Sequence, residues 1–163
     1  MAKSVDEITN EAIEDGGYLC LLYFDMHASS EEAVKNIMVG FIAKLTKEDG
    51  VIYALGDIDK PIVHDDLFSA SAEVKMLIKD LPSFTRICAQ YSPIGIEILR
   101  PHEVKLSLGE LQEALLSVAQ LSSQFASILM QKGLTPEENA LYSRKLEQRM
   151  ALGKNLLERK KQK

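Results

Sequence analysis

Runs of apolar residues in the first hundred positions predict four short strands separated by helices. Two runs are almost continuously apolar, Tyr18–Met26 and Val51–Ile58, whereas Phe68–Ile78 alternates apolar with polar side chains and Ile94–Leu99 is the last run. Between them, apolar residues recur at helical spacing from Val34 to Leu45 and again after Asp80, which is placed as an N-cap. The predicted order is β-α-β-β-α-β, with residues 59–66 as a loop and residues 29–32 as a capping box.

This order resembles the split βαβ pattern of ferredoxin-like folds, an architecture that ACT and RAM regulatory domains share. The resemblance implies an α+β fold, a ferredoxin-like βαββαβ sandwich with an antiparallel four-stranded sheet. Because such a fold hosts many unrelated functions, it favours no single one.

After Pro101 the pattern changes to two long helices, which predict a C-terminal antiparallel helical hairpin. Ser107 with Glu110 caps the first helix, Gly133 ends it, and Thr135 with Glu138 caps the second. Each helix carries one apolar stripe: Leu108, Leu111, Leu115, Val118, Ser122, Phe125 and Leu129 on the first, and Leu146, Met150, Gly153 and Leu157 on the second. We therefore divide the chain into a short N-terminal helix or arm at 1–17, an α/β domain at 18–101 and a hairpin at 102–163.

Composition describes a globular chain. Of its 163 residues 46% are hydrophobic, enough to bury a core, but no run approaches the roughly 18 apolar residues that cross a membrane. Cys20 and Cys88 lie within apolar runs and are expected to be buried free thiols, which fits a reducing, cytoplasmic location. The acidic residues 1–17 lack the apolar core of a secretory signal.

Charge is unevenly distributed. Residues 134–163 contain eight basic and four acidic residues, a net charge of +4, which leaves −9 for the remainder. A basic last helix suits an acidic protein partner or a second copy of the chain, although charged runs are more often simply solvated. Nucleic acid is a poorer match, because the body repels phosphate and the strands lack basic and aromatic pairs.

The first strand is apolar on both faces, and such strands are normally covered on both sides. Two helices of a ferredoxin-like fold cover one face only. The hairpin, a second subunit or both are expected to cover the other, which indicates a homo-oligomer.

Acidic and histidine residues gather where this topology brings strand ends together. They form a candidate site for a divalent metal such as Mg²⁺, Mn²⁺ or Zn²⁺. The candidate ligands are Asp25, His27, Asp57, Asp59, His64, Asp65 and Asp66. The alternative is that these aspartates only form turns and caps. Glu73 and Glu97 are expected to share the open sheet face.

No catalytic motif is present: the sequence lacks a G-x-S-x-G elbow, a metalloprotease H-E-x-x-H and a glycine-rich phosphate loop. The sequence therefore favours a non-enzymatic oligomerising interaction or regulatory module. One alternative is a small-ligand or metal-binding protein or enzyme that uses the acidic and histidine residues. Another is a nucleic-acid binder that uses the basic last helix.

Overall fold

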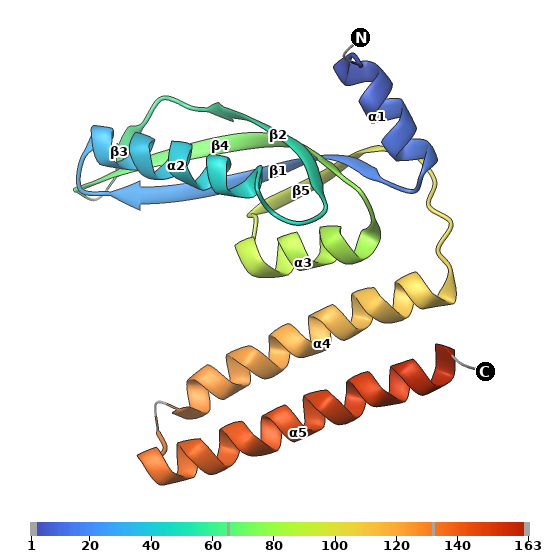
Figure 1. Ribbon diagram of the computed structural model, residues 1–163. Coiled ribbons are helices and arrows are strands. Elements are labelled where there is room, and N and C mark those ends of the chain that lie inside the picture. Colours follow the sequence, from blue (N-terminus) through green and yellow to red (C-terminus); the bar gives the residue numbers. More distant parts are fainter. Residues whose placement is uncertain (1–2, 65, 132, 162–163) are drawn as a thin grey trace. The chain divides into compact units, whose positions relative to one another are not determined.

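An antiparallel sheet forms the centre of the first part of the chain (Figure 1). The computed structural model describes residues 3–64, 66–131 and 133–161, without the side-chain surroundings of residues 64, 146, 149, 150 and 152–161. The elements, in order, are α1 (Val5–Glu14), β1 (Tyr18–Ala28), α2 (Glu31–Leu45), β2 (Val51–Ile58), β3 (Ile62–His64), β4 (Leu67–Ile78), α3 (Leu81–Tyr91), β5 (Gly95–Arg100), α4 (Leu108–Gln131) and α5 (Pro136–Lys161). The mixed α+β class with an antiparallel sheet is confirmed.

The four predicted strands pair in the order β2-β4-β1-β5, and every neighbouring pair is antiparallel. The long β1–β4 pair matches Tyr18 with Ile78 and Ala28 with Phe68. β1 and β4 therefore lie in the middle of the sheet, whereas β5 lies at one edge.

Two local predictions were wrong. Residues 62–64, expected in a loop, form β3 and pair with β4, which makes a fifth strand. Ile62 and Val63 are β-branched and suit an extended backbone, and Asp66 takes the left-handed conformation at the turn, with φ 65°. The N-cap of α2 is Ser30, whose hydroxyl accepts from the Ala33 amide, and not Ser29.

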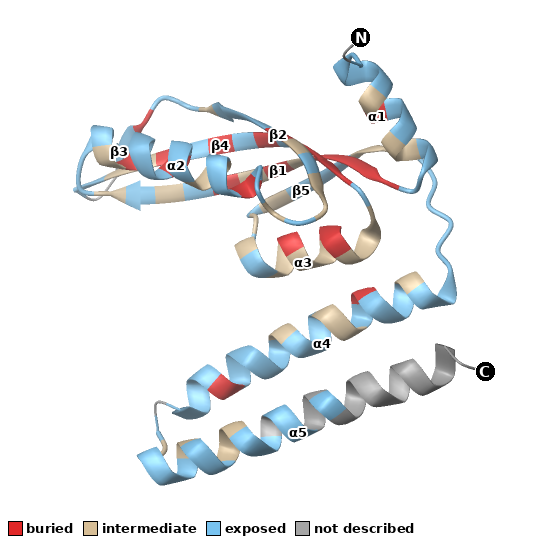
Figure 2. Cartoon of the chain, in the orientation of Figure 1, coloured by how far each residue is buried: buried red, intermediate tan, exposed pale blue. Residues whose placement is uncertain are grey.

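The core lies between the sheet and the helices α2 and α3, as Figure 2 shows by the buried residues of β1 and β4. The alternation predicted for β4 is confirmed, because its even-numbered residues from Ala70 to Ile78 are all buried. The fully buried side chains include Leu22, Val34, Met38, Val74, Met76 and Ile87.

Both cysteines are free, and Cys20 is fully buried. Burial raises the pKa of the Cys20 thiol to about 12 and that of Cys88, which is half-buried, to about 11. The expectation that they pack as thiols is confirmed for Cys20.

A polar cluster ties α3 to the turn after α2. The Tyr91 hydroxyl donates to one oxygen of Glu48, and the Arg86 guanidinium donates to the other at 3.1 Å. Both hydrogen bonds lower the pKa of Glu48, and the bond from Tyr91 has the larger effect. This carboxylate therefore stabilises the fold only in its charged form.

The helix α1 packs on the opposite face of the sheet from α2 and α3. Its Thr9 is buried and shares a 3.0 Å hydrogen bond with the Tyr53 hydroxyl, and Asn10 accepts from Arg100 at 2.9 Å. At this end of β1, Leu19 is buried. We expected the hairpin or a second subunit to cover this face, but α1 covers this part of it.

The chain divides into two compact units, residues 1–119 and 120–163. The helix α4 begins in the first unit and ends in the second. The predicted capping boxes at its start and at the start of α5 are both present: Ser107 pairs with Glu110, and Thr135 pairs with Glu138.

Candidate functional site

The sheet face beyond α1 is polar and hollowed. Register places Tyr23, Glu73 and Asp57 in one row across β1, β4 and β2, with their side chains on the face opposite α2 and α3. An open hollow of about 550 Å³ lies here. Its lining consists of Tyr23, Phe24, Asp57, Asp59, Ser71, Ala72, Glu73, Ile94 and Gly95. We call this region the acidic sheet face.

Tyr23 stands at the centre of the acidic sheet face. Its hydroxyl donates to Glu97 Oε2 at 3.4 Å, and its ring packs beside Gly95, where a Cβ would lie 3.1 Å from a ring carbon. Partial loss of solvent, and then the charges of Glu73 and Glu97, raise the pKa of the Tyr23 phenol. The phenol is therefore a hydrogen-bond donor at neutral pH, surrounded by carboxylates that attract cations.

Asp25 and His27 lie further along β1 on the same face. His27 Nε2 lies 3.3 Å from Asp25 Oδ2, and Ser69 donates a 3.0 Å hydrogen bond to Asp25 Oδ1. Ser71 also donates to Asp25 Oδ1, at 3.5 Å, so three side chains already engage the Asp25 carboxylate.

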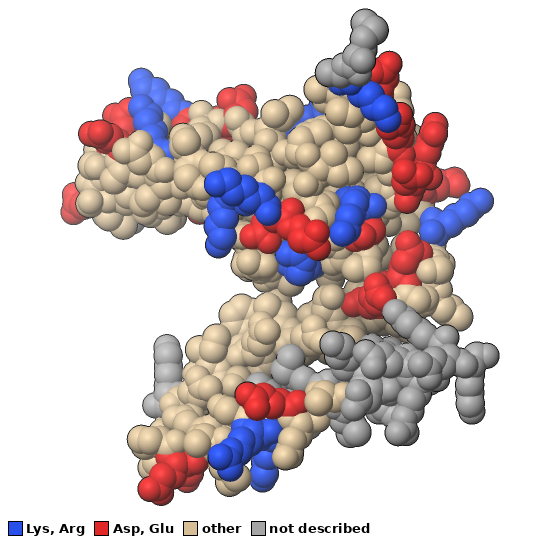
Figure 3. Space-filling model, viewed as in Figure 1, with Lys and Arg blue, Asp and Glu red and all other residues tan. Residues whose placement is uncertain are grey.

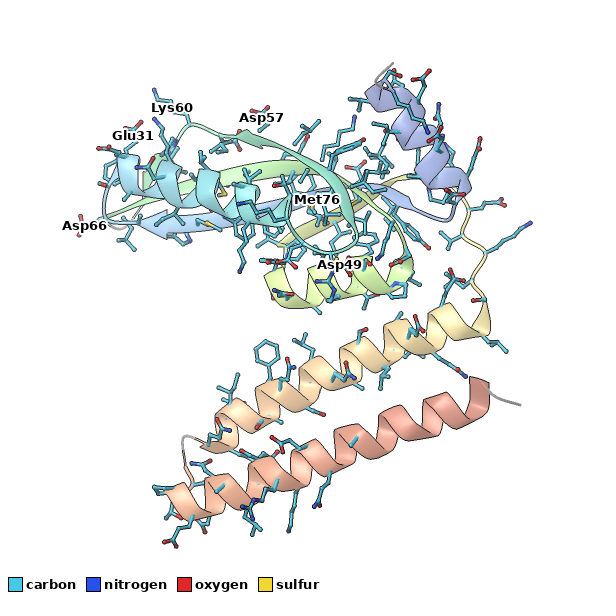
Figure 4. The ribbon with its side chains drawn as sticks, in the orientation of Figure 1. Glu31, Asp49, Asp57, Lys60, Asp66 and Met76 are labelled. Carbon is cyan, nitrogen blue, oxygen red and sulfur yellow. The ribbon has the colours of Figure 1, made fainter. Side chains whose placement is uncertain are left out.

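The other predicted ligands are more widely spread. Asp25 of β1 pairs with Ser71 of β4, and the Asp59 amide donates to the Ser71 carbonyl from the other side of β4. The backbones of Asp25 and Asp59 are therefore separated by two strand spacings, about 10 Å. Asp57 pairs with Glu73, and Asp66 precedes Leu67, about 20 Å further along β4 (Figure 4). One cation therefore does not bridge Asp57 and Asp66.

The remaining two candidates are only partly described. The backbone of His64 belongs to β3, but its side chain lies outside the described residues, as does Asp65. Across the described part of the chain, no group of three His, Cys, Asp or Glu side chains is arranged to hold a metal ion.

Sequence reasoning placed Glu73 and Glu97 on this face but missed Tyr23, Ile94 and Gly95. The position of Tyr23, two residues before Asp25 in a strand, was a signal that both side chains share a face. Ile94 and Gly95 carry no such signal, because only the pairing of β5 with β1 brings them beside Tyr23.

A second surface lies along α4. The predicted apolar stripe is present on one side of the helix, and its side chains are exposed rather than buried (Figure 2). We call this set the α4 stripe; its apolar members are exposed by 41% to 78%: Leu108, Leu111, Leu115, Val118, Phe125 and Leu129. Ser122 occupies the seventh position and is also exposed.

The buried residues of α4 lie elsewhere on the helix. Ala114 and Ser127 are buried, and both lie off the α4 stripe. Among the described residues, the buried positions of α4 therefore lie beside or away from the stripe, whose own side chains stay exposed.

Most of this stretch of α4 lacks charged side chains. No Asp, Glu, Lys or Arg occurs from Ala114 to Gln131, and this surface is tan in Figure 3. Helices exposed to water usually carry charged residues on several sides. None of the helices in the described ranges is both long and apolar enough for a membrane crossing. An uncharged face of this kind is typical of a protein interface.

Comparison with known proteins gives one match. No curated protein and no solved structure matches the chain. The MJ0538 family matches residues 19–147, which include the sheet except Tyr18, the whole of α4 and the start of α5. Because this match spans most of its length, the chain belongs to the MJ0538 family.

Proposed function

We propose that this protein is a non-enzymatic oligomerising module that acts by interaction or regulation. The observation that carries the proposal is the exposed α4 stripe. Six apolar side chains at heptad spacing face solvent in the single chain, and four of them lie in the uncharged segment of α4. Burying a Leu-sized side chain contributes roughly 1.5–3 kcal/mol, so covering this stripe is strongly favourable.

The fold supports a module of this kind. We infer a ferredoxin-like arrangement in which α2 and α3 connect the paired strands, because the order β2-β4-β1-β5 with antiparallel neighbours is the one expected for that topology. We also infer that α4 and α5 form the appended antiparallel hairpin. Asn139 of α5 donates to the Gln131 and Leu134 carbonyls, both at 3.3 Å, and so fastens the connection between the two helices.

Light scattering at micromolar concentration tests the proposal. The wild-type chain is expected to exceed its monomer mass of 18.2 kDa. Leu115→Asp places a charge in the α4 stripe and should return the protein to monomer size. Gln120→Asp adds the same charge to the same helix outside the stripe and should leave the assembly intact. A monomeric wild-type protein would refute the proposal.

The hollow favours one second candidate, a binder of small cations or divalent metal on the acidic sheet face. Asp57, Asp59 and Glu73 line that hollow and bring negative charge to one place. Calorimetry with Mn²⁺ and Zn²⁺ should then detect binding that an Asp57→Ala, Asp59→Ala double variant loses. The absence of heat at millimolar metal would leave these aspartates as turn and surface residues.

An acidic partner for the basic last helix also stays a prediction. Arg144 and Lys145 of α5 are exposed, and the other six basic side chains of residues 134–163 lie outside the described residues. Binding that weakens steeply with salt would support such a partner.

A further inference from the structure

The α4 stripe repeats with the spacing of a coiled coil. Its seven positions alternate steps of three and four residues from Leu108 to Leu129. In heptad terms, Leu115 and Ser122 occupy a positions, and Val118 and Phe125 occupy d positions. A helix with this repeat packs best against a helix with the same repeat, and a second copy of this chain supplies one.

The flanking positions fit a close helix pair. Five of the six e and g positions beside the stripe hold small or apolar residues, and the sixth holds Gln112. The five are Ala114, Ala119, Leu121, Ala126 and Ile128. No charges stand at these flanks to repel an identical helix. The exposed apolar surface of two such stripes is on the order of 1,000 Å², the lower end for a specific interface.

We infer that the α4 stripe binds the α4 stripe of a second copy, with the two helices antiparallel and Val118 opposite the partner's Ser122. This inference rests on the proposed function. In a parallel pair, each residue meets its own copy, so two Phe125 rings would share one layer and two Ser122 hydroxyls the layer before it. In the antiparallel pair, Phe125 faces Leu115 and Ser122 faces Val118, so the layers differ less in volume than in the parallel pair.

The helix dipoles also favour this arrangement, because antiparallel helices place the positive amino end of one dipole beside the negative carboxyl end of the other. The register centres the pair near Gln120, so that residues 109–131 of each copy lie within the contact. The helix is regular from Leu108 to Gln131, so the whole stripe is available.

Disulfide trapping tests the orientation. Val118→Cys and Ser122→Cys are made as separate variants of the full chain, and each is oxidised alone and in an equal mixture. The antiparallel pair predicts a covalent dimer in the mixture and none in either variant alone, because residue 118 meets only residue 122. A mixture of Val118→Cys with Gln120→Cys, an exposed position outside the stripe, is the control and should give no dimer.

Other outcomes overturn the inference in distinguishable ways. A covalent dimer of Val118→Cys alone would show a parallel pair. A wild-type dimer by mass with no trapping in any sample would place the interface elsewhere and leave the proposed function standing. A wild-type monomer refutes both. If that monomer sediments with neutral phospholipid vesicles, the stripe binds a membrane surface instead.

Discussion

Replacing Leu115 by Ala should weaken assembly while hardly changing the stability of the single chain. Leu115 is 61% exposed on α4, whereas Leu22 of β1 is fully buried beneath α2 and α3. Exposed substitutions usually change the free energy of unfolding by no more than about 0.5 kcal/mol. Leu22→Ala is the matched control, because the same atoms are removed from the core, at a cost of about 2–5 kcal/mol.

The magnitudes follow from burial. For a unit of about 100 residues, each 1 kcal/mol moves Tm by roughly 4–8 °C, so Leu22→Ala should lower Tm by at least about 8 °C. If the exposed part of Leu115 is covered in a dimer, each copy loses about 1–2 kcal/mol of interface energy on truncation. The two copies together lose about 2–4 kcal/mol, which weakens the dimer roughly 30- to 700-fold.

Two measurements check this prediction. Thermal unfolding is followed at a dilution where the wild-type chain is monomeric, and sedimentation over a concentration series gives the dissociation constant. A Tm loss for Leu115→Ala equal to that for Leu22→Ala would refute the reasoning, because Leu115 would then be buried within one chain. An unchanged dissociation constant would show that the stripe lies outside the interface.

Three further predictions concern the first unit. Gly50 has φ 81° and its missing Cβ would collide with Ser83, so Gly50→Ala should destabilise the fold by about 1–3 kcal/mol in chemical unfolding. The pKa of Glu48 is lowered in the fold, chiefly by Tyr91, so its stabilisation is present above the unfolded pKa and is lost as pH falls through the folded one. Stability measured from pH 6 to pH 3 should therefore fall less steeply in Glu48→Gln than in the wild type; equal slopes would contradict this. Because burial raises the pKa of Cys20 to about 12, native protein at pH 8 should react with an alkylating agent far more slowly at this thiol than unfolded protein does, and equal rates would show that the thiol is accessible.

The sequence by itself determined features that depend on near neighbours. The alternation in Phe68–Ile78 identified the buried face of β4, because side chains of a strand point alternately to its two sides. The caps at Asp80, Ser107 and Thr135 were also predictable, since the side chain of each cap accepts from an amide only three residues on.

The tertiary structure decided everything that depends on which distant segments pair. The helix α1 covers Leu19 because Tyr53 comes within reach of Thr9, more than forty residues away, and this pairing has no local signal. The strand register likewise separates Asp57 from Asp66, although the two lie close in sequence. Asp57 lies opposite Glu73 of β4, whereas Asp66 directly precedes Leu67 at the start of β4. The helical periodicity of the sequence also located the α4 stripe. An apolar stripe has the same sequence pattern whether it packs against a core or is exposed to solvent. Only its packing partners distinguish the two, and in the single chain the stripe faces solvent.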